Sequence, residues 1–133
     1  PIVKFLEGKD GIKNIFQDVV DSLAEGDTYY TYTSRRPKTE GYLSATYEKI
    51  RIEKKLKRRG ITSEKILHTK PATHEGDKIM PEKYGLFNQN IKQLIYGDKV
   101  AFIDFNSETG ILIENKAIAE FQKKIFMILY DRL

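Results

Sequence analysis

The stretch from Asn90 to Asn115 constrains the fold most strongly, because it predicts three consecutive β-strands. Its central part contains four successive apolar residues, 100–103, with the sequence VAFI. Side chains of a strand alternate between the two faces of a sheet, so neither face of this strand can be left to water. We therefore predict a central strand covered on both sides, with one cover supplied by the apolar helix that begins at Lys116.

Turn residues separate the three predicted strands, which are residues 91–96, 99–105 and 111–114. Gly97 and Asp98 suit a tight hairpin, because glycine tolerates positive φ and aspartate can hydrogen-bond its own backbone. The longer connection ends in a glycine, which is typical of a wider hairpin loop.

The first part of the chain predicts strands that alternate with helices. Residues 2–6 and 27–34 are rich in β-branched, aromatic and bulky apolar side chains, as strands are. Between them, apolar residues recur every three or four positions, which predicts an amphipathic helix capped by Asp10 and ended by Gly26.

Further elements are predicted by the same patterns. We expect a second helix over residues 42–59 that ends at Gly60, then a strand over 61–68. Pro81 would confine its segment to a sheet edge or a loop. A final helix is expected over residues 116–133, with an apolar surface broad enough to pack on the sheet or on a partner subunit.

The composition describes one soluble domain over residues 1–133. The order of its predicted strands and helices indicates an α/β fold in which helices flank a mixed β-sheet. Hydrophobic residues make up 40% and charged residues 32%, which excludes a disordered chain. The chain has no cysteine, so it has no disulfides, thiolate metal site or thiol nucleophile, and this fits the cytoplasm. No apolar run approaches the roughly 20 residues of a membrane span. The net charge of +4 would favour an anionic partner without requiring one.

Three segments, in order and at similar spacing, resemble the C-terminal effector-binding domain of the TrmB family of transcriptional regulators. They are FLEGKDGIKNIFQDVVDSL, IYGDKVAFIDF and GILIENKAIAEFQKKIFMILYDRL. The resemblance covers most of the chain and is weakest between Thr28 and Lys83. It implies a phospholipase-D-like fold that follows a winged helix-turn-helix. No such DNA-binding segment is present here, so we expect an excised sensor domain or a stand-alone relative, and Pro1 is compatible with both.

The resemblance also implies that the domain is not an enzyme. The catalytic strand of phospholipases D has the pattern His-x-Lys-(x)4-Asp, in which the imidazole is the nucleophile and the lysine holds the phosphate. Lys99 and Asp104 keep this spacing, but Gly97 occupies the histidine position. Alternatively, Lys99 and Asp104 simply flank a buried strand and lie in water, since such a spacing arises often by chance.

Tyrosines, Ser34 and arginines cluster where the strand over residues 27–34 leads into a loop. Ligands of open α/β sheets lie outside the carboxyl ends of strands, and these groups suit a sugar or an anionic metabolite. The alternative is that the tyrosines pack into the sheet while the arginines are solvated. Together with residues that the resemblance implies, the candidate ligand-binding residues are Tyr32, Ser34, Arg35, Lys99, Asp104, Glu114 and Asn115.

Two other clusters have ordinary explanations. The basic tract over residues 49–59 suits the C-terminal end of a helix, where cations complement the helix dipole. Contact with nucleic-acid phosphates is the alternative, but the tract lacks the stacking aromatics of single-strand binders. His68 and His74, with Glu75 and Asp77, could form a metal site, yet two histidines in a loop are usually solvated. We expect no metal and no cofactor.

These features predict a non-catalytic, cytoplasmic sensor and dimerisation domain of a TrmB-like regulator. It would bind a small effector, such as a sugar or a related metabolite, and so control an attached DNA-binding module. It would contact DNA only through that module and would not contact a membrane. We expect a homodimer that forms through residues 91–115 or the terminal helix. The alternatives are a ligand-free dimerisation module of the same fold and a phosphodiesterase-like enzyme, which Gly97 argues against.

Overall fold

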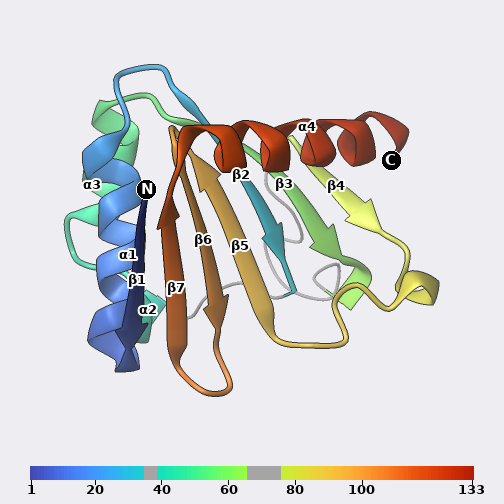
Figure 1. The fold of residues 1–133 in the computed structure, drawn as a ribbon, viewed down its shortest axis with the longest axis horizontal. Coiled ribbons are helices and arrows are strands. Elements are labelled where there is room, and N and C mark those ends of the chain that lie inside the picture. Colours follow the sequence, from blue (N-terminus) through green and yellow to red (C-terminus); the bar gives the residue numbers. More distant parts are fainter. Residues whose placement is uncertain (35–38, 66–75) are drawn as a thin grey trace.

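A computed structural model describes residues 1–34, 39–65 and 76–133, which form a mixed β-sheet flanked by helices, as predicted (Figure 1). Within these residues the strand order is β1-β7-β6-β5-β2-β3-β4. The strands are β1 (Ile2–Glu7), β2 (Thr28–Thr33), β3 (Lys57–Ser63), β4 (Asp77–Met80), β5 (Ile91–Tyr96), β6 (Lys99–Asp104) and β7 (Thr109–Glu114). The helices are α1 (Gly8–Ser22), α2 (Thr39–Tyr42), α3 (Tyr47–Glu53) and α4 (Lys116–Arg132), with a 3-10 turn at Glu82–Tyr84. No helix in the described ranges is long and apolar enough to cross a membrane.

The sheet changes from antiparallel to parallel pairing at β2. Strands β1, β7, β6, β5 and β2 pair antiparallel in that order, whereas β2, β3 and β4 run parallel. Both predicted hairpins are present, and Gly97 adopts the positive φ of 57° that its tight turn requires. Strand β4 lies at the sheet edge and ends at Met80, immediately before Pro81, as the missing N–H of proline predicts.

The central strand β6 is covered on both faces. Val100, Ala101 and Ile103 have no exposed surface, because α1 packs on one face of the sheet and α4 crosses the other (Figure 1). Apolar residues on both faces of one strand therefore predicted its position correctly.

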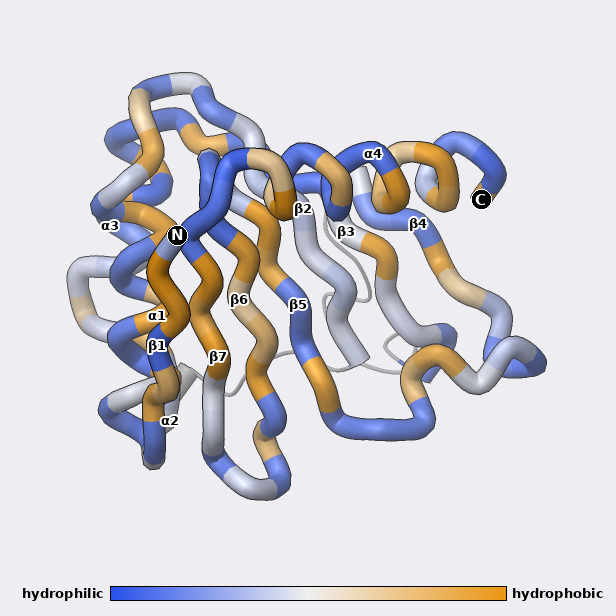
Figure 2. The backbone as a smooth tube through the Cα atoms, in the orientation of Figure 1, coloured by the Kyte–Doolittle hydropathy of each residue, from blue (hydrophilic) through white to orange (hydrophobic). Residues whose placement is uncertain are grey.

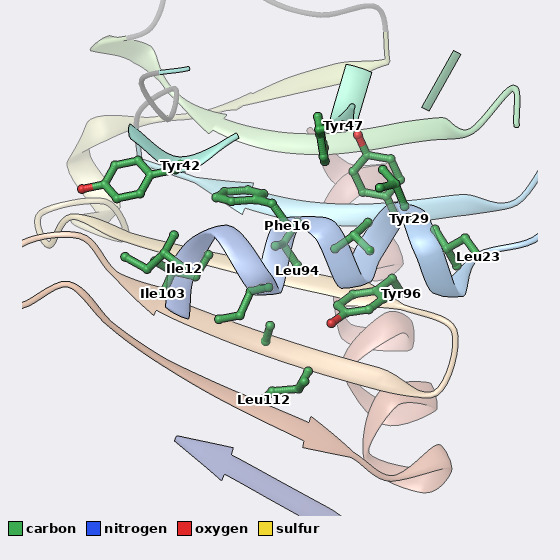
Figure 3. Close-up of a cluster of buried hydrophobic side chains, with 14 of the residues drawn as sticks. Ile12, Phe16, Leu23, Tyr29, Tyr42, Tyr47, Leu94, Tyr96, Ile103 and Leu112 are labelled. Carbon is green, nitrogen blue, oxygen red and sulfur yellow. The ribbon is translucent and has the colours of Figure 1, made fainter. Parts of the chain in front are cut away.

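Helix α1 supplies the larger core, and its apolar stripe points into the sheet (Figure 3). Ile12, Phe16 and their neighbours pack against side chains such as Leu94 and Leu112, and each such burial stabilises the fold by about 1.5–3 kcal/mol. The helix starts at Gly8, so the predicted capping role of Asp10 is wrong: this residue lies in the first turn. The start is set instead by the backbone N–H of Gly8, which donates to the carbonyl of Glu108 at 2.7 Å.

The predicted single helix over residues 42–59 is wrong at both ends, because α2 ends at Tyr42 and α3 covers only Tyr47–Glu53. Helix α3 ends at Glu53, and Lys55 adopts a φ of 53°, which a continuing helix does not allow. The Lys54 ammonium instead donates to the carbonyls of Val20 and Leu23 at the C-terminal end of α1.

Residues 57–63 form β3 because they pair with strands on both sides, and such tertiary pairing overrides local helix propensity. The predicted strand over residues 61–68 is thus displaced toward the N-terminus. Gly60, expected to end a helix, lies inside β3. A Cβ there would collide with the side chains of Asp77 and Arg58, so the ion pair packed against this position favours glycine.

Helix α4 contains many apolar residues (Figure 2), some buried against the sheet and others exposed to solvent. Its inner face buries Phe126 completely, in edge contact with the rings of Tyr30 and Tyr32 at centroid distances of 5.3 and 5.2 Å. Its outer face leaves apolar side chains exposed, among them Phe121 and Ile128. The breadth expected of this apolar surface is confirmed.

Candidate ligand-binding site

A row of polar side chains lies where β2 and β6 end and β5 begins. The hydroxyl of Ser34 donates to Oδ1 of Asn90 at 3.2 Å, and Nδ2 of Asn90 donates to Oδ1 of Asn106 at 3.1 Å. Backbone hydrogen bonds hold the row in place, because the N–H of Ser34 donates to the Ile91 carbonyl and that of Phe105 to the Asn90 carbonyl. The row therefore occupies the carboxyl ends of two strands, the edge at which open α/β sheets bind ligands.

Lys92 lies beneath this row. Asn90 immediately precedes β5 and lies two residues before Lys92. The hydrogen bond from the Phe105 N–H to the Asn90 carbonyl continues the strand pairing there, so both side chains project from the same face of the sheet. Only 5% of Lys92 is exposed, and its ammonium donates to the hydroxyl of Thr33 at 2.6 Å. The Thr33 hydroxyl lies 3.1 Å from that of Thr31, and both threonines are buried. A lysine is thus enclosed among neutral hydroxyl groups.

The charges around Lys92 do not balance. Burial lowers the pKa of Lys92 well below its usual value, the positive charge of Arg58 lowers it further, and Asp77 raises it. Asp77 forms an ion pair with Arg58 between β3 and β4, and both side chains are largely buried. Within the described part of the chain, no carboxylate lies at ion-pair distance from Lys92. When Lys92 is protonated, it and Arg58 therefore form two cations that face one carboxylate among the described residues of this cluster.

The structure separates the candidate residues of the β2 end. Ser34 belongs to the polar row described above. Tyr32 projects from the opposite face of the sheet, where it packs on Phe126 and where burial raises its pKa to about 12. Tyr29 and Tyr42 belong to the core under α1. These tyrosines thus pack on the sheet, as the alternative interpretation proposed, whereas Arg35 lies outside the described residues.

Lys99 and Asp104 stand on opposite faces of β6, because they are five positions apart, an odd number, along an alternating strand. They are also about 16 Å apart along the strand, so a single small ligand cannot sit between them. The Lys99 ammonium pairs with Asp18 at 2.9 Å, and Asp104 accepts a hydrogen bond from the Asn106 N–H at 3.0 Å. At Gly97 a Cβ would meet no atom within 4 Å. The turn therefore shows no enclosed space that a histidine would line.

Glu114 and Asn115 lie at the other end of the sheet from Ser34. Glu114 is exposed and pairs with Lys99 across β6 and β7. The side chain of Asn115 caps α4 by accepting from the Ile118 N–H at 3.1 Å. The structure thus assigns Asn115 a structural role and brings neither residue to the polar row.

The basic tract over residues 49–59 does not form one continuous charged face. It is divided among α3, the connection that follows and β3. Arg51 pairs with Glu48, Arg58 pairs with Asp77, and Arg59 lies 5.7 Å from the ring centroid of Tyr130. These contacts give the three arginines of the tract structural partners and so weaken the nucleic-acid interpretation.

The possible metal site cannot be assembled from the described residues. His68, His74 and Glu75 lie outside them, and in the part that is described no three His, Cys, Asp or Glu side chains gather as metal ligands do. Asp77 is instead the ion-pair partner of Arg58.

Sequence reasoning missed Asn90, Lys92 and Asn106. A signal for Lys92 was present, because it alternates with Leu94 and Tyr96 and so shares the buried face of its strand. The two asparagines gave no such signal, since their contact depends on strand pairing.

No protein-family model and no curated protein sequence matches this chain. Among solved structures, one of TrmBL2, an archaeal chromatin protein that shows a novel mode of DNA binding, matches 98% of this chain with a TM-score of 0.65. The chain has the fold of part of TrmBL2. Sequence identity is 12%, and the chain spans about half of TrmBL2, 51% of its length. The expected likeness to a TrmB-type protein is confirmed at the level of the fold.

Proposed function

We propose that this domain is the non-catalytic regulatory half of a TrmB-type DNA-binding protein, which joins two copies and binds a small effector. The likeness to half of TrmBL2 supports this proposal, because the unmatched half leaves room for a separate DNA-binding module. The Ser34 hydroxyl donates its hydrogen bond to the amide oxygen of Asn90, and an amide oxygen is not a general base. This contact does not activate Ser34 as a nucleophile, which fits a role in binding.

The observation that carries the proposal is the outer face of α4. Four apolar residues on this face follow one another at intervals of three, four and three positions: Ile118, Phe121, Ile125 and Ile128. All four are exposed, and Phe121 shows 63% of its surface to water. Spacing of this kind forms the seam between two packed helices. An exposed apolar stripe beside a second, buried one calls for a partner.

Edge strand β1 presents further exposed apolar side chains on the same side of the sheet as α4. Val3 and Phe5 project from the face that α4 covers elsewhere, and Phe5 is 76% exposed. A free edge strand with apolar side chains is a site of association unless it is covered. We call Val3, Phe5 and the four residues of the α4 stripe the pairing surface.

A second copy of the chain is the occupant that we assign to the pairing surface. Two identical stripes can pack on each other about a twofold axis, so that each copy covers the other. Such an arrangement would let an effector act on the relative position of two attached DNA-binding modules.

Sedimentation velocity over a range of protein concentrations tests this pairing. The domain should sediment as a dimer, and Phe121→Glu should sediment as a monomer with unchanged circular dichroism, because a buried glutamate in the seam is costly. Ile52→Glu is the matched control, since Ile52 is 62% exposed on α3, which packs with α1. A monomeric wild type, or equal effects of the two substitutions, would reject the pairing.

A further inference from the structure

We infer that Lys92 and the polar row above it bind a phosphorylated sugar, with the anionic group of the ligand on the Lys92 ammonium. This inference rests on the proposed effector-binding function and names the class of effector. It is carried by three features of the site: a buried cation, an unbalanced charge, and a row of amides and hydroxyls at the sheet edge.

The buried cation lacks enough hydrogen-bond partners. An ammonium has three N–H donors, and within the described residues the Lys92 group donates only to Thr33. Burying an ammonium among neutral groups is unfavourable, because it loses hydration that one hydroxyl does not replace. A phosphate oxygen on the ammonium would restore the missing interaction and would keep the lysine charged.

The charges select an anion over a neutral ligand. Asp77 is held by Arg58 in an ion pair, so it does not neutralise Lys92 at close range. With Lys92 protonated, the described residues Lys92, Arg58 and Asp77 together carry one net positive charge in a region of low dielectric. A neutral sugar would leave this charge uncompensated, whereas a phosphate monoester would balance it.

The polar row suits the remainder of such a ligand. Asn90 lies two residues before Lys92, so their Cα atoms are about 7 Å apart, a spacing comparable to that between the phosphate group of a sugar phosphate and the far hydroxyls of its ring. Asn90 and Asn106 offer amide donors and acceptors for those hydroxyls, and Asn106 is exposed to solvent. The ligand would therefore enter from the strand ends and place its phosphate deepest.

Thermal unfolding of residues 1–133 with glucose 6-phosphate, glucose, inorganic phosphate and sulfate tests the inference. Glucose 6-phosphate should raise the Tm, inorganic phosphate should raise it less, and glucose should leave it unchanged. In Lys92→Met the rise should disappear, while the Tm without ligand should stay equal or increase because a buried charge is gone. Lys99→Met is the matched control, since that lysine pairs with Asp18 and should keep the full response.

The result in wild type does not depend on the folding of any variant. Phosphate binding should also raise the pKa of Lys92, which NMR of the lysine side chains measures directly in the unaltered protein. The inference is overturned if no anion raises the Tm, if Lys92→Met responds as wild type does, or if the Lys92 resonance is unaffected.

The inference and the proposed function can fail separately. If glucose raises the Tm and still does so in Lys92→Met, the proposed effector-binding function stands and the inference of an anionic effector is rejected. Phe121→Glu should keep its response to glucose 6-phosphate even as a monomer, because Lys92 and Asn90 belong to one chain and lie on the α1 face of the sheet. If the wild type is a dimer but its Tm responds to no tested anion, the proposed pairing stands and only the phosphorylated ligand is rejected.

Discussion

Substitution of the two phenylalanines of α4 separates the role of its inner face from that of its outer face. Phe126 has no exposed surface and touches the rings of Tyr30, Tyr32 and Tyr130 at centroid distances of 5.3, 5.2 and 5.6 Å. Truncating a buried phenylalanine to alanine costs about 3–5 kcal/mol. Since domains are stable by about 5–15 kcal/mol, Phe126→Ala should remove about a fifth or more of the free energy of unfolding.

Urea unfolding at several protein concentrations is the assay. The loss in Phe126→Ala should be the same at every concentration, because the contact lies within one chain. Phe121→Ala should cost below about 0.5 kcal/mol in dilute solution, as surface substitutions do, and more as concentration rises, because pairing stabilises the folded state by mass action. Equal losses in the two variants in dilute solution would refute the assignment of the two faces.

Three further predictions concern the fold and its pH dependence. Gly110→Ala should cost about 1–3 kcal/mol, because its Cβ would lie 2.5 Å from Cδ1 of Ile15, and unfolding curves should show partial rescue by Ile15→Val, which removes that methyl group. Asn115→Ala should cost about 1 kcal/mol through loss of the α4 cap, whereas Asn115→Asp should retain the stability. Burial raises the pKa of Tyr32 to about 12 from its usual 10.0, so its neutral form is favoured by folding. Its contribution to stability is complete below pH 10 and is lost as the pH rises toward about 12. Urea midpoints at pH 9 and pH 11 should therefore fall less in Tyr32→Phe than in wild type, and an equal fall would contradict this assignment.

The second half of the sheet could be predicted from sequence because its strands are consecutive. Two turn signals and a fully apolar strand define β5 to β7 without knowledge of distant pairing. The strand β3 could not be predicted in the same way. Its residues continue a helical pattern, and only pairing with β2 and β4 makes them a strand.

The candidate site was only partly predictable for a related reason. Ser34 could be predicted because it ends a strand, where ligands of open sheets bind. The contact from Ser34 through Asn90 to Asn106 joins residues 56 and 16 positions apart, and only the strand order brings them together. The spacing of Lys99 and Asp104 matched a known motif, yet an odd separation on a strand places them on opposite faces.

Cross-linking through a single introduced cysteine tests the central claim, the pairing of two α4 helices, most directly. The chain contains no cysteine, so Ile125→Cys provides one thiol on the outer face of α4. With a short bis-maleimide in dilute solution, this variant should form a covalent dimer in high yield, because identical residues meet near a twofold axis. Ile52→Cys, exposed on α3, should remain a monomer on the same gel. Equal yields from the two positions, or no dimer from Ile125→Cys, would contradict the account.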